Sequence, residues 1–217
     1  MKYLFSLLLC FIASQVFCQK FSNPDSVLAW LQEGNNSFIQ GKYHVAGVDA
    51  SLRTELVNAQ HPKAVILTCS DSRVPPELIF DKGLGDLFVI RVAGNIADDA
   101  VIGSIEYAVE HLHASLVVVM GHQSCGAIAA AVSDMQKPDE IHDHVRVLTD
   151  KIQQAVAAVN LKESDANQKA LLSNIIFTVS SLKHSRPVLH EAVEKGELKI
   201  TGAVYHLSTG KVEWLDK

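Results

Sequence analysis

Three short segments of the chain are almost continuously apolar and rich in β-branched residues. They are Lys63–Thr68, Leu87–Val92 and Leu116–Met120. A strand with one side in water alternates apolar and polar side chains, whereas a strand covered on both faces does not. The three segments are therefore predicted to be buried strands of one sheet.

Apolar residues between the second and third segments follow a helical period. Within Ala100–His113 they recur at Ile102, Ile105, Val109 and Leu112, the spacing that places side chains on one face of a helix. Buried strands that alternate with helices are typical of a parallel sheet. We predict an α/β fold in which helices flank a mainly parallel central sheet.

Further helices are predicted on both sides of this unit. Asn23 and Pro24 suit the cap and first turn of a helix that ends near Gly41. Further helices are predicted at Ser51–Ala59, Ala127–Met135, Val145–Val159, Asn167–Leu182 and Val188–Glu194, and the fourth of these has apolar residues at helical spacing. Two final apolar segments, Leu198–Leu207 and Val212–Leu215, flank a Ser-Thr-Gly turn and predict a terminal hairpin.

Length and composition fit a single globular domain. The 217 residues are 48% hydrophobic and 20% charged, which is enough to bury one full core. The formal net charge is -5 and no long block of Lys and Arg is present, so a nucleic-acid partner is not expected. Small molecules and other protein chains remain as partners.

Residues 1–18 have the pattern of a secretory signal peptide. Lys2 gives a positive start, Leu4–Phe17 is almost wholly apolar, and cleavage is expected before Gln19. A membrane span needs roughly 20 apolar residues, and the apolar stretch Leu4–Phe17 is shorter than that. We therefore predict an exported protein, periplasmic or secreted, with one domain over residues 19–217. Cys18 also allows a lipoprotein, but Phe17 is a poor residue to precede a lipidated cysteine.

Cleavage at this point would leave two of the four cysteines. Cys10 and Cys18 would be removed, and Cys69 and Cys125 would remain. Two thiols in an oxidising compartment can form a disulfide. Both lie among other residues of ligand type, however, and that arrangement favours a metal site over a disulfide.

Residues able to hold a metal come after two of the predicted strands. Cys69 follows the first, and His122 and Cys125 follow the third. Ligands gather at the carboxyl ends of parallel strands, so the three side chains should meet if these strands are neighbours. Two thiolates and an imidazole are a typical zinc set that leaves a fourth position for water or substrate. Asp71 is a fourth candidate ligand, but Arg73 can hold its carboxylate away from the metal.

The candidate ligands belong to a set of four sequence motifs. They are CSDSRVP at Cys69–Pro75, RVAGN at Arg91–Asn95, GSIEYAV at Gly103–Val109 and GHQSCGA at Gly121–Ala127. These motifs resemble those of the β-class carbonic anhydrases. The resemblance extends from about Val27 to Leu215. It implies a zinc enzyme that interconverts carbon dioxide and bicarbonate, built on the β-carbonic anhydrase fold with an N-terminal helical arm and assembled as a homodimer or tetramer.

The resemblance also implies a role for each residue of the site. Cys69, His122 and Cys125 would be the permanent zinc ligands, and Asp71 with Arg73 would form the catalytic dyad. In some family members the aspartate moves onto the zinc and closes the site, so Asp71 is also a candidate fourth ligand in a closed state.

Two positions near the first cysteine bear on the subtype. The closing subtype has tryptophan three residues before this cysteine, where Ile66 stands, and the plant-like open subtype has glutamine nine residues before it, where Gln60 stands. We therefore favour the open subtype, with Gln60 in substrate binding. Phe88, Val89 and Tyr107 are candidates for the apolar substrate pocket by resemblance, although their spacing alone favours ordinary core packing.

Two other functions fit the same residues. A related zinc hydrolase of carbon disulfide or carbonyl sulfide would use the same metal and dyad with a different pocket entrance. A non-catalytic zinc-stabilised scaffold is the third hypothesis. Asp71 and Arg73 count against it, because a scaffold does not need a positioned carboxylate beside an open ligand position.

Overall fold

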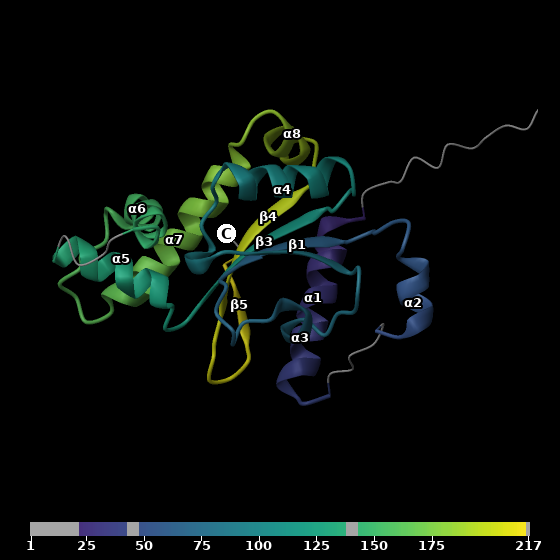
Figure 1. The fold of residues 1–217 in the computed structure, drawn as a ribbon, viewed down its shortest axis with the longest axis horizontal. Coiled ribbons are helices and arrows are strands. Elements are labelled where there is room, and N and C mark those ends of the chain that lie inside the picture. Colours follow the sequence, from purple (N-terminus) through teal and green to yellow (C-terminus); the bar gives the residue numbers. More distant parts are fainter. Residues whose placement is uncertain (1–21, 43–47, 138–142, 216–217) are drawn as a thin grey trace, which may run out of the picture.

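A single five-stranded sheet forms the centre of the chain (Figure 1). The computed structural model describes residues 22–42, 48–137 and 143–215, so the expected signal peptide lies outside the described residues. In spatial order the strands are β2 (Leu87–Arg91), β1 (Ala64–Thr68), β3 (Leu116–His122), β4 (Lys199–Tyr205) and β5 (Val212–Trp214). The first four are parallel, and β5 is antiparallel to β4. The mainly parallel sheet and the terminal hairpin are confirmed.

Helices cover both faces of this sheet. Those with predicted counterparts are α1 (Pro24–Ile39), α2 (Ala50–Glu55), α4 (Asp99–Glu110), α5 (Gly126–Gln136), α6 (Val145–Val156), α7 (Ala166–Lys183) and α8 (Val188–Glu194). The sequence did not predict α3 (Pro76–Ile79) or the 3-10 turn Ala93–Asn95, because both are too short to show a period. None of the helices in the described part of the chain is long and apolar enough to cross a membrane.

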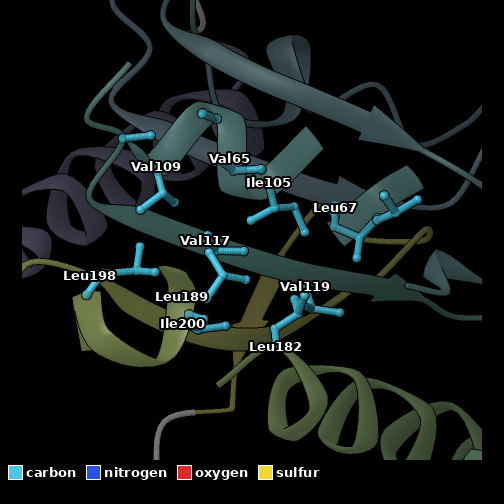
Figure 2. Packing of buried hydrophobic residues seen from close by; sticks show 14 of the residues in the cluster. Val65, Leu67, Ile105, Val109, Val117, Val119, Leu182, Leu189, Leu198 and Ile200 are labelled. Carbon is cyan, nitrogen blue, oxygen red and sulfur yellow. The ribbon is translucent and has the colours of Figure 1, made fainter. Parts of the chain in front are cut away.

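Alternate residues of the central strands enter two different cores. On one face Val65 and Leu67 pack with α4, α7 and α8, as Figure 2 shows. On the other face Ala64 and Ile66 pack with α1 and α3. Because both faces are covered, β1 and β3 are buried at every position, and this burial is the physical reason for their continuous apolar runs.

The second predicted strand is an exception to this burial. β2 is an edge strand that pairs only with β1 in the described sheet, and its residues are half-buried or exposed rather than covered on both faces. Phe88 and Ile90 contact the core on the α4 face. An apolar edge strand is a surface that proteins usually cover, so this position bears on assembly.

The N-terminal helix is fixed to its own sheet. Val27, Leu28 and Leu31 of α1 are buried in the same core as Ile66 of β1. Asn35, 3% exposed, donates hydrogen bonds to the carbonyls of Ile79 and Gly210, and its Oδ1 accepts one from the Val212 amide. One helical side chain thus joins α1 to α3 and to the terminal hairpin. Although Asn35 begins an Asn-Asn-Ser sequence, the match to a glycosylation acceptor, its buried amide is committed to these bonds.

Asn35→Ala is expected to lower the free energy of unfolding by about 2–4 kcal/mol, because two carbonyls and one amide lose their partners inside the protein. Urea unfolding followed by circular dichroism measures this loss. Asn36→Ala is the matched control, since Asn36 is exposed on the same helix and should change stability by no more than about 0.5 kcal/mol. Equal effects of the two substitutions would contradict the assigned role of Asn35.

Candidate metal centre

The carboxyl ends of two neighbouring strands bring the predicted ligands together. β1 and β3 are adjacent, with Thr68 opposite Met120, and Cys69 directly follows β1. The strand β3 continues two residues beyond its predicted end, because its pairing with β4 extends to His122. Cys125 is the N-cap residue of α5. The ligand atoms of Cys69, His122 and Cys125 all lie within 4.8 Å of one another.

The donor set fits a tetrahedral metal ion. All three side chains are buried, and the two sulfur atoms are 3.9 Å apart, close to the roughly 3.8 Å that two tetrahedral Zn–S bonds of about 2.3 Å require. His122 Nδ1 lies 2.8 Å from the Gln123 carbonyl oxygen, to which it can donate. That bond leaves Nε2 as the acceptor, and Nε2 is buried without a hydrogen-bond partner among the residues that the structure describes. A metal ion would satisfy this nitrogen.

Contacts between the ligands perturb their protonation. The hydrogen bond with Cys125 holds the pKa of the Cys69 thiol far below its ordinary value, against the effect of burial. The same contact with Cys69, together with burial, raises the pKa of Cys125. Burial is the largest single influence on His122 and acts to lower its pKa, but Cys69, the Gln123 carbonyl and Asp71 together raise the pKa above its ordinary value. The site therefore concentrates negative charge on buried sulfur, which favours a cation among the three side chains.

Asp71 is held by Arg73 in a bidentate pair. Arg73 Nε donates to Asp71 Oδ1 at 2.9 Å and Nη2 to Oδ2 at 2.7 Å, and the Arg73 amide also donates to Oδ1. The Asp71 side chain is 18% exposed and that of Arg73 is 56% exposed. The hydrogen bonds from Arg73 hold the pKa of the Asp71 carboxyl well below its usual range. The carboxylate stays ionised, and Oδ2 lies 3.8 Å from His122 Nε2.

Three residues support this loop in ways that the sequence analysis missed. Arg91, at the end of β2, donates to the backbone carbonyls of Cys69 and Asp71. The Gly94 amide approaches Cys69 Sγ at 3.4 Å, and Asn174 of α7 donates to the Gly94 carbonyl. Arg91 and Gly94 belong to the RVAGN motif, so a local signal existed, whereas nothing in the sequence near Asn174 indicates its contact.

Gly94 has a conformation that few other residues adopt. Its φ is +74°, and a Cβ atom at this position would lie 2.7 Å from Ile152 Cδ1 and 3.3 Å from Ala127 Cβ. Glycine at this position therefore combines a left-handed turn with the close approach of its amide to the sulfur of Cys69.

The predicted substrate-binding residues lie on separate elements. Phe88 and Val89 are in β2, and Tyr107, 49% exposed, is in α4. The rings of Phe88 and Tyr107 are 6.4 Å apart between centroids, so these two are brought together. Gln60 is exposed in the segment between α2 and β1. In the described residues, no hydrogen bond, ion pair or ring contact joins any of the four to the three metal-ligand candidates.

A buried Cys-His-Cys set with an adjacent carboxylate, placed at the end of a parallel sheet, is typical of enzymes with one catalytic metal ion. In such sites three protein ligands leave the fourth position open for water or substrate. Comparison with known proteins identifies the family within this class. The profile of the family described as carbonic anhydrase matches residues 64–212. The chain belongs to the carbonic anhydrase family, and its sequence and fold relatives are of the β class.

Relatives of similar length support this assignment. A carbonic anhydrase of Mycolicibacterium smegmatis is 36% identical over 193 residues, which cover 88% of this chain and 94% of that protein. Carbonic anhydrase 2 of Mycobacterium tuberculosis is 37% identical over 191 residues, covering 87% of this chain and 92% of that one. The resemblance seen in the sequence motifs is confirmed.

Solved structures show the same fold. The β-carbonic anhydrase CcaA superposes with a TM-score of 0.65 at 26% identity and covers 90% of this chain and 96% of its own. A Coccomyxa β-carbonic anhydrase in complex with acetazolamide gives a TM-score of 0.70 at 25% identity, over 89% of this chain and 84% of its own. The predicted fold class is confirmed.

Proposed function

We propose that the chain catalyses the zinc-dependent, reversible hydration of carbon dioxide to bicarbonate and a proton. The observation that carries this function is the Asp71 carboxylate, held by Arg73 beside a buried Cys69, His122 and Cys125 set. Zinc bound by three protein ligands keeps a fourth position for water and makes that water more acidic, as it does in carbonic anhydrases generally.

Asp71 and Arg73 have distinct parts in this reaction. Asp71 is ionised and accepts a hydrogen bond from the reacting oxygen, which directs a lone pair of that oxygen toward the carbon of the substrate. Arg73 keeps the carboxylate ionised and fixes its orientation through two parallel hydrogen bonds. The Gln123 carbonyl accepts a hydrogen bond from the ring of His122, which orients the ring and leaves Nε2 to bind the metal.

We assign the site to the open subtype. In the closed subtype Asp71 would leave Arg73 and become a ligand, whereas here both of its oxygens accept hydrogen bonds from Arg73. Ile66 and Gln60 support the same assignment. X-ray absorption at the zinc edge is expected to show two sulfur ligands and an unchanged number of oxygen and nitrogen ligands across the pH range. A gain of one oxygen ligand as pH falls would assign the closed subtype instead.

Carbon dioxide is apolar, and its pocket needs apolar walls. We assign these walls to Phe88, Val89 and Tyr107, with Gln60 as a polar contact to substrate. Within the described residues, no hydrogen bond, ion pair or ring contact joins them to the metal-ligand candidates, so we assign completion of the pocket to a neighbouring subunit.

We infer that the chain assembles as a homodimer or tetramer. The apolar edge strand β2 and the exposed ring of Tyr107, which contacts Phe88, offer apolar surface that association would cover. Tetrameric β-carbonic anhydrases are known from Sordaria macrospora. Sedimentation velocity measures the state directly, and a monomer at micromolar concentration would oppose this inference.

A hydration assay on zinc-loaded protein tests the main proposal. We expect stopped-flow measurement with a pH indicator to show hydration far above the uncatalysed rate. Hydrolysis of carbon disulfide or carbonyl sulfide without hydration of carbon dioxide would favour the related hydrolase. Absence of turnover with all of these substrates at full zinc loading would favour the third hypothesis, a non-catalytic zinc-stabilised scaffold.

Export is the proposed location, on the basis of the N-terminal sequence pattern alone. Lys2 and the apolar stretch Leu4–Phe17 match a signal peptide. N-terminal sequencing of the protein purified from its source should begin near Gln19. A mature protein that retains Lys2 would exclude cleavage.

A further inference from the structure

The backbone of Gly94 contacts the candidate metal centre on one side and helix α7 on the other. Its amide approaches Cys69 Sγ at 3.4 Å, and its carbonyl accepts a hydrogen bond of 2.8 Å from Nδ2 of Asn174. All three residues are buried, and the Asn174 side chain belongs to a residue that is only 1% exposed. One glycine therefore connects a sulfur atom of the metal-ligand set to a buried amide 80 residues further along the chain.

The conformation of Gly94 does not hold itself in place. Its φ is +74° and its ψ is 13°, and the close approach of Ile152 leaves no room for a Cβ atom. Glycine is the residue that fits, but it is also the residue with the widest range of backbone conformations. The direction of its amide therefore depends on contacts made by the neighbouring peptide groups.

The peptide group between Gly94 and Asn95 is held at both of its polar atoms. The Asn95 amide donates to the Val92 carbonyl at 2.9 Å, a bond that belongs to the turn itself. The Gly94 carbonyl accepts from Asn174, which lies outside the turn. Without Asn174 this carbonyl would be buried without the bond that the structure gives it, and the peptide group would be free to rotate toward another donor.

Helix α7 is itself fixed close to the metal-ligand strand by a second glycine. A Cβ atom on Gly121 would lie 2.6 Å from Leu171 Cδ1 and 2.7 Å from Ile175 Cδ1. Leu171 and Ile175 lie within one turn of Asn174 on α7 and pack in the core on that face of the sheet. Because Gly121 directly precedes His122, α7 packs against β3 one residue from a candidate ligand (Figure 1).

We propose that Asn174 is a positioning residue for the metal centre, which holds Gly94 so that the Gly94 amide donates to the sulfur of Cys69. The inference rests on the zinc site of the proposed function. An N–H donor withdraws negative charge from a thiolate, and hydrogen bonds of this kind adjust how much charge a ligand gives to its metal. Asn174 thus acts on Cys69 through Gly94 and touches neither the metal position nor the substrate.

Cobalt in place of zinc makes the charge on sulfur measurable. In the full-length protein loaded with Co²⁺, thiolate ligands give a sulfur-to-metal charge-transfer band in the near ultraviolet, and the energy of this band falls as the sulfur becomes richer in electrons. Asn174→Leu keeps a side chain of similar size but has no donor, so the band is expected to move to longer wavelength. An unchanged band in folded, cobalt-loaded Asn174→Leu would overturn the proposal. Asn174→Ala removes the donor without filling its space and should shift the band in the same direction.

Ser173→Ala is the matched control on the same helix. Ser173 Oγ donates to the Ala155 carbonyl at 2.7 Å, so this variant loses one hydrogen bond of α7 that does not involve Gly94. Its unfolding midpoint in urea should fall, while its charge-transfer band should stay where it is in the wild type. An equal shift in Ser173→Ala would show that any loosening of α7 is sufficient and would contradict the proposal. Failure of both Asn174 variants to fold, while Ser173→Ala folds, would assign Asn174 a structural role only and would also contradict it.

The spectrum does not require turnover, so this inference and the proposed function fail separately. A band shift in the Asn174 variants of a protein that does not hydrate carbon dioxide would support the role of Asn174 and oppose the proposed function. An active wild-type protein whose Asn174 variants keep the wild-type band would support the proposed function and overturn the role of Asn174.

Discussion

Asp71→Asn is expected to lower kcat for carbon dioxide hydration by about 100-fold or more while zinc content and fold are retained. The amide is almost isosteric with the carboxylate, but it carries no charge and can accept at only one atom. Asp71 accepts hydrogen bonds from Arg73 at two oxygen atoms, and the amide has only one. The amide therefore cannot replace these hydrogen bonds and also orient the reacting oxygen. Losses of this size are typical when a positioned acid–base or hydrogen-bonding group is removed. Stopped-flow hydration on protein of known zinc content measures the effect.

Ser72→Ala is the matched control for this variant. Ser72 lies between Asp71 and Arg73 and is exposed. The kcat of the Ser72→Ala enzyme should therefore stay within about twofold of the wild-type value. Wild-type activity in Asp71→Asn at full zinc loading would show that the carboxylate has no catalytic role. Loss of zinc from Asp71→Asn would instead show that Asp71 is a ligand.

Cys125→Ala is expected to abolish stable zinc binding and, with it, hydration activity. The substitution leaves Cys69 and His122 as the only members of the three-residue set, and two ligands do not hold zinc against dialysis. Elemental analysis after dialysis against a weak chelator measures the metal, and circular dichroism reports whether the helices and sheet remain.

Gln123→Ala serves as the control in the same loop. Gln123 is exposed, and its known contacts with His122 and Tyr205 are made by its backbone, so zinc content should not change. Full zinc occupancy in Cys125→Ala would exclude Cys125 as a ligand. Loss of secondary structure would point to a structural contribution of the metal, which Cys69→Ala should then reproduce.

Much of the fold could be predicted from local patterns. The continuous apolar runs of β1 and β3 result from burial of these strands on both faces, and the 3.6-residue period of α4 results from burial of one helix face. Both patterns are local consequences of how an element is covered, so they can be read without knowing what covers it. α3 has only four residues, which is too few for any period, and it could not be found in this way.

The candidate ligands were also indicated by the sequence, because each motif follows the end of a predicted strand. The prediction that Cys69, His122 and Cys125 bind a metal needed only their residue types and the rule that ligands gather at the carboxyl ends of parallel strands. Their convergence to within 4.8 Å depended on β1 and β3 being neighbours, which strand order in the sequence does not establish.

The sequence by itself therefore determined the elements, the family resemblance and the candidate ligands. Tertiary structure alone decided the partner of Asp71, since a carboxylate two residues from both Cys69 and Arg73 can reach either a metal or a guanidinium. It also placed β2 at an open edge of the described sheet. Each of these outcomes depends on distances between segments that are far apart in the chain or on competition between partners, and neither leaves a local pattern in the sequence.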